Sequence, residues 1–106
     1  MKCCKPNLNI LNKMFKALGD SNRMAIFEHL CNCCRSGRYQ CNVKEVSTCC
    51  DVDLSVVSRH LSQLKKAQIL KSSKNGKEVF YSINAKELAQ ELRNLADYIE
   101  NFCKEN

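Results

Sequence analysis

The chain has 106 residues, of which 44% are hydrophobic, and this length supports one domain with a modest core. Its 17 Lys and Arg residues against 11 Asp and Glu residues give a net charge of +6, which favours a polyanionic partner such as nucleic acid. No apolar run reaches the length of a membrane span, and no secretory apolar segment follows Met1–Lys5. We therefore expect residues 1–106 to form a single cytoplasmic domain without a membrane partner.

Helical periodicity predicts two helices in the N-terminal part of the chain. The first covers roughly residues 7–18 and ends at Gly19, and its expected apolar face consists of Leu8, Leu11, Phe15 and Leu18. Ser21 is expected to cap the second helix. The apolar face of that helix is expected to contain Met24, Phe27, Cys31 and Cys34, with Ile26 and Leu30 beside it.

A short helix, a turn and a longer helix are predicted next, which is the order of a helix-turn-helix. Asn42 and Glu45 have the spacing of a capping box at the start of the short helix. Asp53 is expected to cap the longer helix, which covers residues 53–66. The apolar side of the longer helix is expected to consist of Leu54, Val57, Leu61 and Leu64.

The other side of this longer helix is polar and basic. It carries Ser55, Arg59, Ser62 and Lys66, with Ser58 and Gln63 flanking them. A helix that seats one side in a small domain and offers such side chains on the other can meet base edges and phosphates in a major groove. We interpret it as a DNA-recognition helix. Taken alone, an ordinary solvated surface helix is the alternative.

Residues 69–83 predict a β-hairpin. Asn75-Gly76 separates two β-prone runs, and this dipeptide is a strong hairpin signal because both residues tolerate positive φ. Lys74 and Lys77 lie in or beside the turn, so the hairpin is interpreted as a wing that contacts DNA phosphates. The alternative is that these lysines only solubilise the hairpin.

A last helix is predicted from about Asn84 to Cys103, with Glu87 placed to complete a second capping box. Its apolar seam consists of Leu88, Leu92, Leu95, Ile99 and Phe102. This seam packs either on the chain's own first helix or on a second subunit. The expected fold is mainly α with a small β-hairpin wing, a winged helix-turn-helix that forms a homodimer through residues 7–18 and 84–103.

Nine cysteines are the second strong signal in the sequence. Their odd number and the lack of an export segment argue for reduced thiols rather than a disulfide framework. Thiolates select thiophilic centres such as Zn, Cd, Pb, Hg, Cu(I) and As(III) over Mg or Ca. Trivalent arsenic needs only three thiolates, and only His29 and His60 are available for a mixed zinc site.

Two groups of cysteines are candidate metal sites. The short loop between Cys34 and Cys41 allows a local cluster of Cys31, Cys33, Cys34 and Cys41. The other group is Cys49, Cys50 and Cys103, with or without Cys3 and Cys4 of the partner subunit. Cys31, Cys34 and Cys50 also continue apolar stripes, so each has simple packing as its alternative role.

Three segments, in this order, carry a resemblance to a known family: Phe15–Ile26, Val57–Leu70 and Gly76–Tyr81. In these segments the chain resembles the ArsR/SmtB family of winged-helix metalloregulatory repressors, over roughly Phe15 to Cys103. The resemblance implies a homodimer that sits on double-stranded operator DNA and is released when a toxic metal or metalloid binds.

The resemblance also implies roles for particular residues. Ser55, Ser58, Arg59, His60 and Gln63 fall where the family reads DNA, with Val56 in the same stretch and Lys74 and Lys77 in the wing. A half-buried structural role is the alternative for His60.

The sensor region departs from the family pattern. Arsenic and cadmium members place a Cys-x-Cys where this chain has Asn42 and Lys44, directly after Cys41. Zinc members use histidines in the last helix, where this chain has Asp97 and Glu100 but no histidine.

The sequence thus predicts a repressor induced by a thiophilic ion, with As(III) favoured. One alternative is a thiol-based redox or persulfide sensor of the same fold, and another, from a different class, is a small cysteine-rich metal buffer. Glycine-rich phosphate loops, paired carboxylates and convincing Cys-His-Asp arrangements are missing from the sequence, so we expect neither an enzyme nor a small organic substrate.

Overall fold

The computed structural model describes residues 5–48 and 50–103 as five helices and one two-stranded antiparallel sheet. The elements are α1 (Leu8–Leu18), α2 (Ser21–Arg35), α3 (Val43–Ser47), α4 (Leu54–Lys66), β1 (Leu70–Asn75), β2 (Glu78–Ile83) and α5 (Ala85–Phe102). This order confirms the predicted mainly helical fold with a hairpin wing. No helix within the described ranges has the length and apolar character needed to cross a membrane.

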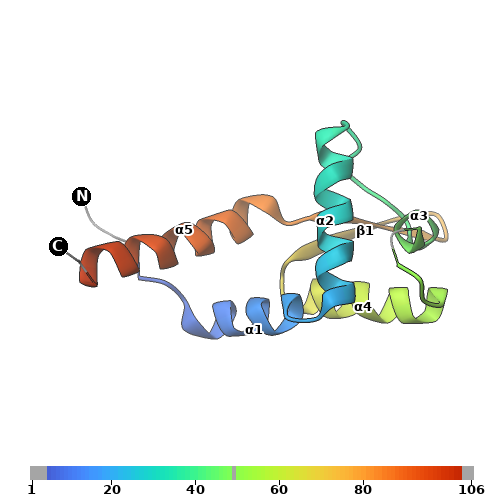
Figure 1. Cartoon of the computed structure of the whole chain (residues 1–106). Coiled ribbons are helices and arrows are strands. Elements are labelled where there is room, and N and C mark those ends of the chain that lie inside the picture. The colour runs from blue at the N-terminus through green and yellow to red at the C-terminus, as the bar shows by residue number, and fades with distance from the viewer. Residues whose placement is uncertain (1–4, 49, 104–106) are drawn as a thin grey trace.

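The helices pack around α2. Figure 1 shows α2 with its N-terminal end against α1 and α4 and its C-terminal end pointing away from them, while α3 lies on the far side of α2 from α5. Every helix and both strands contribute buried side chains to the core, with three each from α1 and α4. Its largest fully buried members are Met14, Ile26, Leu30, Cys41, Val46, Val57, Leu61, Leu64, Ile69 and Leu70.

The helix α5 gives the chain an elongated shape. The Cα radius of gyration is 15.6 Å, whereas a compact chain of this size would have about 13 Å. Only the start of α5 is well covered, since Leu88 is buried while Ile99 is exposed and Phe102 is 70% exposed. The outer half of α5 extends away from α2 (Figure 1), and its exposed apolar side chains include Ile99 and Phe102.

The predicted apolar faces of the first two helices are partly wrong. In α1 the core receives Leu11, Met14 and Ala17, while Leu8 is 64% exposed and Phe15 is also exposed. Apolar residues of this helix form two overlapping faces. Packing against α2 and α4 buries the face whose residues are three positions apart, Leu11, Met14 and Ala17. In α2 the buried residues are Ile26 and Leu30, and the predicted Met24 is exposed.

The helix starts also differ from some predictions. Asp20, not Ser21, caps α2, because its carboxylate accepts hydrogen bonds from the backbone N–H groups of Asn22 and Arg23. The predicted capping box at α5 is absent: Asn84 instead donates its side-chain amide to the Gln68 carbonyl at 3.0 Å. Asp53 precedes α4 without a side-chain cap.

The hairpin turn is shifted by one residue from its predicted position. Asn75 pairs with Glu78, so Gly76 and Lys77 are the two turn residues. Gly76 has φ +68°, whereas Asn75 does not take the positive φ that was expected for it. A glycine at the first position suits a two-residue hairpin turn because positive φ costs it nothing.

Replacing a buried residue of α4 tests how this helix is held. Leu61 is fully buried. The substitution Leu61→Ala should lower the free energy of unfolding by about 2–5 kcal/mol, because the lost side chain leaves a cavity in the core. Leu54→Ala, at a position 47% exposed on the same helix, is the control and should cost under about 1 kcal/mol. Urea unfolding under a phosphine reductant measures both. Equal losses would contradict the packing described.

Candidate DNA-binding and thiol sites

The helix α4 has one buried side and one exposed side. Val57, Leu61 and Leu64 are buried, and they fix the rotation of the helix in the domain. Leu54, predicted for this side, is largely exposed because it lies at the first turn, beyond the core. On the opposite side the exposed predicted DNA-binding residues are Ser55, Ser58, Arg59, Ser62, Gln63 and Lys66, while Val56 and His60 are half-buried. The polar stripe is thus open to a ligand.

The wing lies beside this helix. Lys74 and Lys77 are exposed at and next to the hairpin turn. The hairpin reaches the same end of the molecule as the start of α4 (Figure 1). The arrangement places positive charge at the hairpin tip and along α4, the two places where a winged helix contacts DNA backbone.

Arg23 on α2 is a residue whose role the sequence analysis missed. Its guanidinium donates to the Ala17 carbonyl at 2.5 Å and to Gln63 Oε1 at 2.6 Å, and it also lies 3.4 Å from His60 Nδ1. Because an arginine can only donate hydrogen bonds, His60 Nδ1 is placed as the acceptor in this contact. One side chain therefore joins the end of α1 to the recognition helix.

This linkage changes the reading of two predicted DNA contacts. Gln63 is exposed but holds the Arg23 guanidinium, and His60 is half-buried beside it. The backbone N–H of Arg23 lowers the pKa of Asp20, with the charge of Arg23 adding to the effect. The carboxylate therefore stays ionised at neutral pH and keeps its cap on α2. The sequence signal for this cap was Asp20 directly after Gly19, with Arg23 three residues later.

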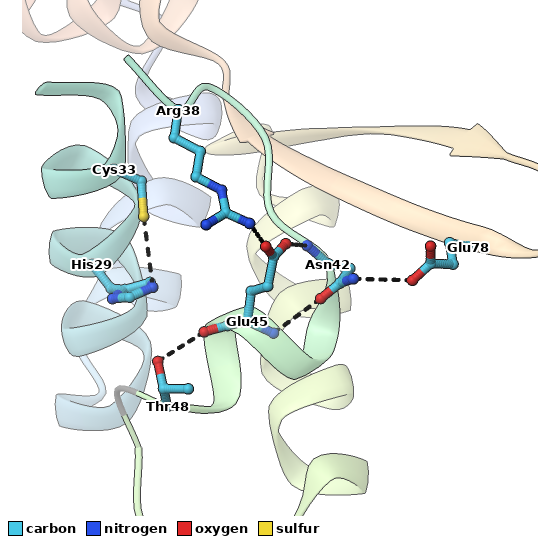
Figure 2. Close-up of polar contacts among 7 residues, drawn as sticks. All are labelled: His29, Cys33, Arg38, Asn42, Glu45, Thr48 and Glu78. Carbon is cyan, nitrogen blue, oxygen red and sulfur yellow. Dashed lines mark hydrogen bonds and ion pairs between the residues drawn. The ribbon is translucent and has the colours of Figure 1, made fainter. Parts of the chain in front are cut away.

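The helix α3 is anchored to the wing by a set of polar contacts (Figure 2). The predicted capping box is present, since Asn42 and Glu45 exchange hydrogen bonds at 2.9 Å. The Asn42 amide also donates to Glu78 at the start of β2, and Arg38 forms an ion pair with Glu45. The backbone of Cys41 pairs with that of Tyr81. These contacts fix the start of α3 against β2.

The candidate cysteines occupy different environments. Cys41 is only 1% exposed, and burial followed by a hydrogen bond with the Cys33 thiol raises its pKa to about 11. Cys33 also lies 3.6 Å from His29 Nε2, one turn back on α2 (Figure 2). Cys50 is half-buried near the Asn22 carbonyl, and Cys103 is exposed at the end of α5. Cys3, Cys4 and Cys49 lie outside the described residues.

The structure does not bring three of the predicted ligands together. Within residues 5–48 and 50–103 there is no group of three His, Cys, Asp or Glu side chains that could hold a metal ion. Within the expected cluster of four, Cys33 forms a hydrogen bond with Cys41, and burial raises the pKa of both Cys31 and Cys41, with a smaller contribution from the charge of Cys34. Cys31 and Cys33 are not in contact with a common third ligand among the described side chains. Cys31 and Cys33 lie on nearly opposite sides of α2, because successive residues of a helix point about 100° apart.

Comparison with known proteins agrees with this fold. The sequence profile of the family described as helix-turn-helix domain matches residues 18–73, just over half of the chain. An ArsR-like regulator from Rhodococcus sp. RHA1 is 25% identical, with a TM-score of 0.73 over 90% of this chain and 84% of that one. An ArsR family transcriptional regulator is 21% identical, with a TM-score of 0.74 over 97% and 100% of the two chains.

A third similar structure is the homodimeric winged helix-turn-helix DNA-binding domain from Mycobacterium bovis. It is 18% identical, with a TM-score of 0.65 over 93% of this chain and 86% of that one. A search of curated proteins finds no match to this chain. The chain belongs to the helix-turn-helix domain family and has the winged-helix architecture of ArsR-type transcriptional regulators. This class comprises DNA-binding regulators and not enzymes.

A double-mutant cycle tests the link between α2 and the recognition helix. Arg23→Ala and Gln63→Ala should show a coupling of about 0.5–3 kcal/mol in the free energy of unfolding, because each removes the same hydrogen bond. The pair Arg23→Ala with Ser62→Ala, at the neighbouring exposed position, is the control and should be additive. Additivity in the Gln63 cycle would contradict the linkage.

Proposed function

We propose that the protein is a cytoplasmic transcriptional repressor that binds operator DNA as a homodimer and is released when a thiophilic ion binds its cysteines. Trivalent arsenic is the favoured inducer, with Cd, Pb, Zn, Hg and Cu(I) as the other thiophilic ions. The observation that carries the DNA-binding part is the exposed polar stripe of α4, opposite its buried Val57, Leu61 and Leu64. A helix held in this way can enter a major groove without disturbing the core.

The homodimer is supported by apolar surface on the terminal helices. Exposed apolar side chains gather on α1 and α5, namely Leu8, Phe15, Leu92, Tyr98, Ile99 and Phe102. Scattered single apolar residues are ordinary on a surface, but a seam along one helix is typical of an interface. The Mycobacterium bovis neighbour is homodimeric, which supports the same assembly for this chain. Two subunits would present two recognition helices to successive major grooves.

The proposed release depends on where the thiols lie. Cys33 of α2 forms a hydrogen bond with Cys41, whose backbone pairs with Tyr81 of the wing and which directly precedes the Asn42 cap of α3. The helix α3 packs in turn against α4. A ligand that binds one arrangement of these elements more tightly than the other shifts the population between them. A coupling of about 1–3 kcal/mol, or about 5- to 150-fold in DNA affinity, is typical for such linkage.

A thiol-based redox sensor is the second candidate function. It is favoured by the hydrogen bond between the Cys33 and Cys41 thiols, since neighbouring thiols can join as a disulfide. The raised pKa of Cys41 weakens this candidate, because the thiolate is the reactive form and Cys41 stays protonated at neutral pH.

Removing one positive charge from α4 tests the DNA interface. Arg59→Ala should weaken binding to a duplex selected from a random-sequence pool by about 1–3 kcal/mol, because arginine contacts to bases and phosphates are lost. Arg35→Ala removes the same charge from the exposed end of α2, away from α4, and should leave affinity nearly unchanged. Fluorescence anisotropy at fixed salt gives both values. Equal effects of the two changes would contradict a specific role for α4.

Release of this complex separates the two sensing hypotheses. Arsenite should lower DNA affinity when a phosphine reductant is present, since such a reductant keeps thiols free without binding arsenic as dithiols do. Under the redox alternative, arsenite has no effect and peroxide or polysulfide abolishes binding instead. The same anisotropy titration, with sodium chloride at matched ionic strength as the control, distinguishes these outcomes.

A further inference from the structure

A groove between α1 and the C-terminal end of α4 is lined by lysines from both helices, and we name it the lysine groove. Its volume is about 320 Å³. Its walls are formed by Lys13, Lys16 and Ala17 of α1 and by Gln63, Lys66 and Ala67 at the end of α4. A smaller hollow beside it is again lined by Lys13 and Lys66. Two helices that are distant in the sequence therefore bring three positive charges to one place.

The three lysines of the groove have no negative charge to balance them. Lys13, Lys16 and Lys66 are all exposed, and none of the residues that form the walls is acidic. In the part of the chain that the structure describes, none of the three forms an ion pair. Neighbouring like charges repel each other, so an anion that enters the groove is attracted by all three ammonium groups.

Arg23 fixes the two walls of the groove relative to each other. Its guanidinium donates hydrogen bonds to the Ala17 carbonyl on α1 and to Gln63 Oε1 on α4, and both acceptors belong to residues of the groove. Because Arg23 occupies the Gln63 oxygen, the amide nitrogen of Gln63 remains as a donor. Ala17 and Ala67 are nearly buried and small, so they leave space between the lysines. The groove is therefore preformed.

The lysine groove continues the polar side of the recognition helix. Lys66 is the last residue of α4 and belongs to the stripe that also contains Ser55, Arg59 and Ser62. Figure 1 shows α1 and α4 along the same side of the molecule, with the start of α4 near the wing and its end near α1. The wing lysines and the lysine groove thus lie at opposite ends of the recognition helix.

We propose that the lysine groove binds phosphates of the DNA backbone at the inner edge of each half-site, through Lys13, Lys16 and Lys66. This inference rests on the proposed function and adds two residues of α1 to its DNA interface. The 13 residues of α4 span about 20 Å, whereas a major groove is about 12 Å wide. Both ends of the helix therefore reach a backbone that borders the groove. The wing contacts one backbone, and the lysine groove contacts the other.

The lysine groove stays open in the proposed dimer. Successive residues of a helix point about 100° apart, so Lys13 lies about 160° around α1 from Phe15. The exposed Phe15 and Leu8 belong to the apolar surface proposed for the dimer interface, on the other side of α1. Because α1 is a proposed dimer helix, its lysines lie nearer to the second subunit than the wing does. The groove therefore faces the inner edge of a half-site.

The residue types of the groove favour phosphate over base edges as the ligand. A lysine ammonium is a compact point charge on a flexible stem, which suits a phosphate oxygen and carries little base specificity. The groove should thus add affinity that depends on salt and is equal for different sequences. Sequence preference is left to the residues of α4 that enter the major groove.

The salt dependence of DNA binding measures these contacts. Lys13→Gln and Lys16→Gln keep a long polar side chain at exposed positions, and each removes one phosphate contact per subunit. Since a dimer loses two contacts, the slope of log K against log salt concentration should fall by about 1.8 for each variant. Affinity at about 0.1 M salt should fall about 10- to 100-fold, equally for a selected operator and a random duplex.

Arg35→Gln is the matched control for the loss of one positive charge. Arg35 is exposed at the end of α2 that points away from α1 and α4 (Figure 1). Its replacement should change the salt slope by less than about 0.5, because no phosphate contact is lost. Circular dichroism and thermal unfolding of the three variants show that each retains the fold.

Neutral methylphosphonate linkages in the operator locate the contact. Placed at the inner edges of the half-sites, they should weaken binding by the wild-type protein and have much less effect on the variant that combines Lys13→Gln and Lys16→Gln. Placed at the outer edges, beside the wing, they should weaken both proteins equally. These two positions separate the lysine groove from the wing.

Failure of this inference differs from failure of the proposed function. Unchanged salt slopes in the lysine variants, with the wild-type protein bound to its operator, overturn the groove contact and leave the repressor proposal standing. A loss confined to the selected operator also overturns it, because phosphate contacts act on every sequence. A wild-type chain that binds no duplex overturns both proposals. If a variant does not fold, a wild-type protein that is insensitive to the inner linkages still overturns the contact.

Discussion

The burial of one side of α4 is the constraint on which the rest of the structure depends. Val57, Leu61 and Leu64 are fully buried, so the rotation of this helix in the domain is set by the core. The opposite side of the helix is then exposed at Ser55, Arg59, Ser62 and Lys66. This rotation leaves Arg59 and its neighbours exposed. The net positive charge and the lysines of the wing support DNA binding only because these α4 side chains are accessible.

Two sets of polar contacts join the helix-turn-helix to neighbouring elements. Arg23 ties the end of α1 to Gln63, which joins a proposed dimer helix to the recognition helix through one side chain. Asn42 ties α3 to the first residue of β2, which joins the helix-turn-helix to the wing. Cys33 of α2 forms a hydrogen bond with Cys41, which directly precedes Asn42. A ligand there would act on the spacing of the DNA-contacting elements and not on the contacts themselves.

Local chemistry made part of this structure predictable from sequence. The capping box of Asn42 and Glu45, the hairpin and the two-sided α4 depend on residues close together in the chain, and all three are present. Long-range packing decided the rest. Leu8 and Phe15 have the spacing of core residues but are exposed, since α1 turns Met14 toward its neighbours. The spacing of Asp20 and Arg23 pointed to the cap of α2 but not to the contact with Gln63, because Gln63 is 40 residues from Arg23 in the chain. The thiophilic site stays a prediction, and within the described residues the expected cysteines are not part of any group of three metal-binding side chains.

The central claim is that two outward-facing α4 helices of a dimer grip one duplex. A hydroxyl-radical footprint on a selected operator tests it most directly. The account predicts two protected regions on one face of the DNA, separated by about 10 base pairs, and their joint loss when a thiophilic ligand is added. A single protected region, or protection that is spread evenly around the duplex, would contradict it.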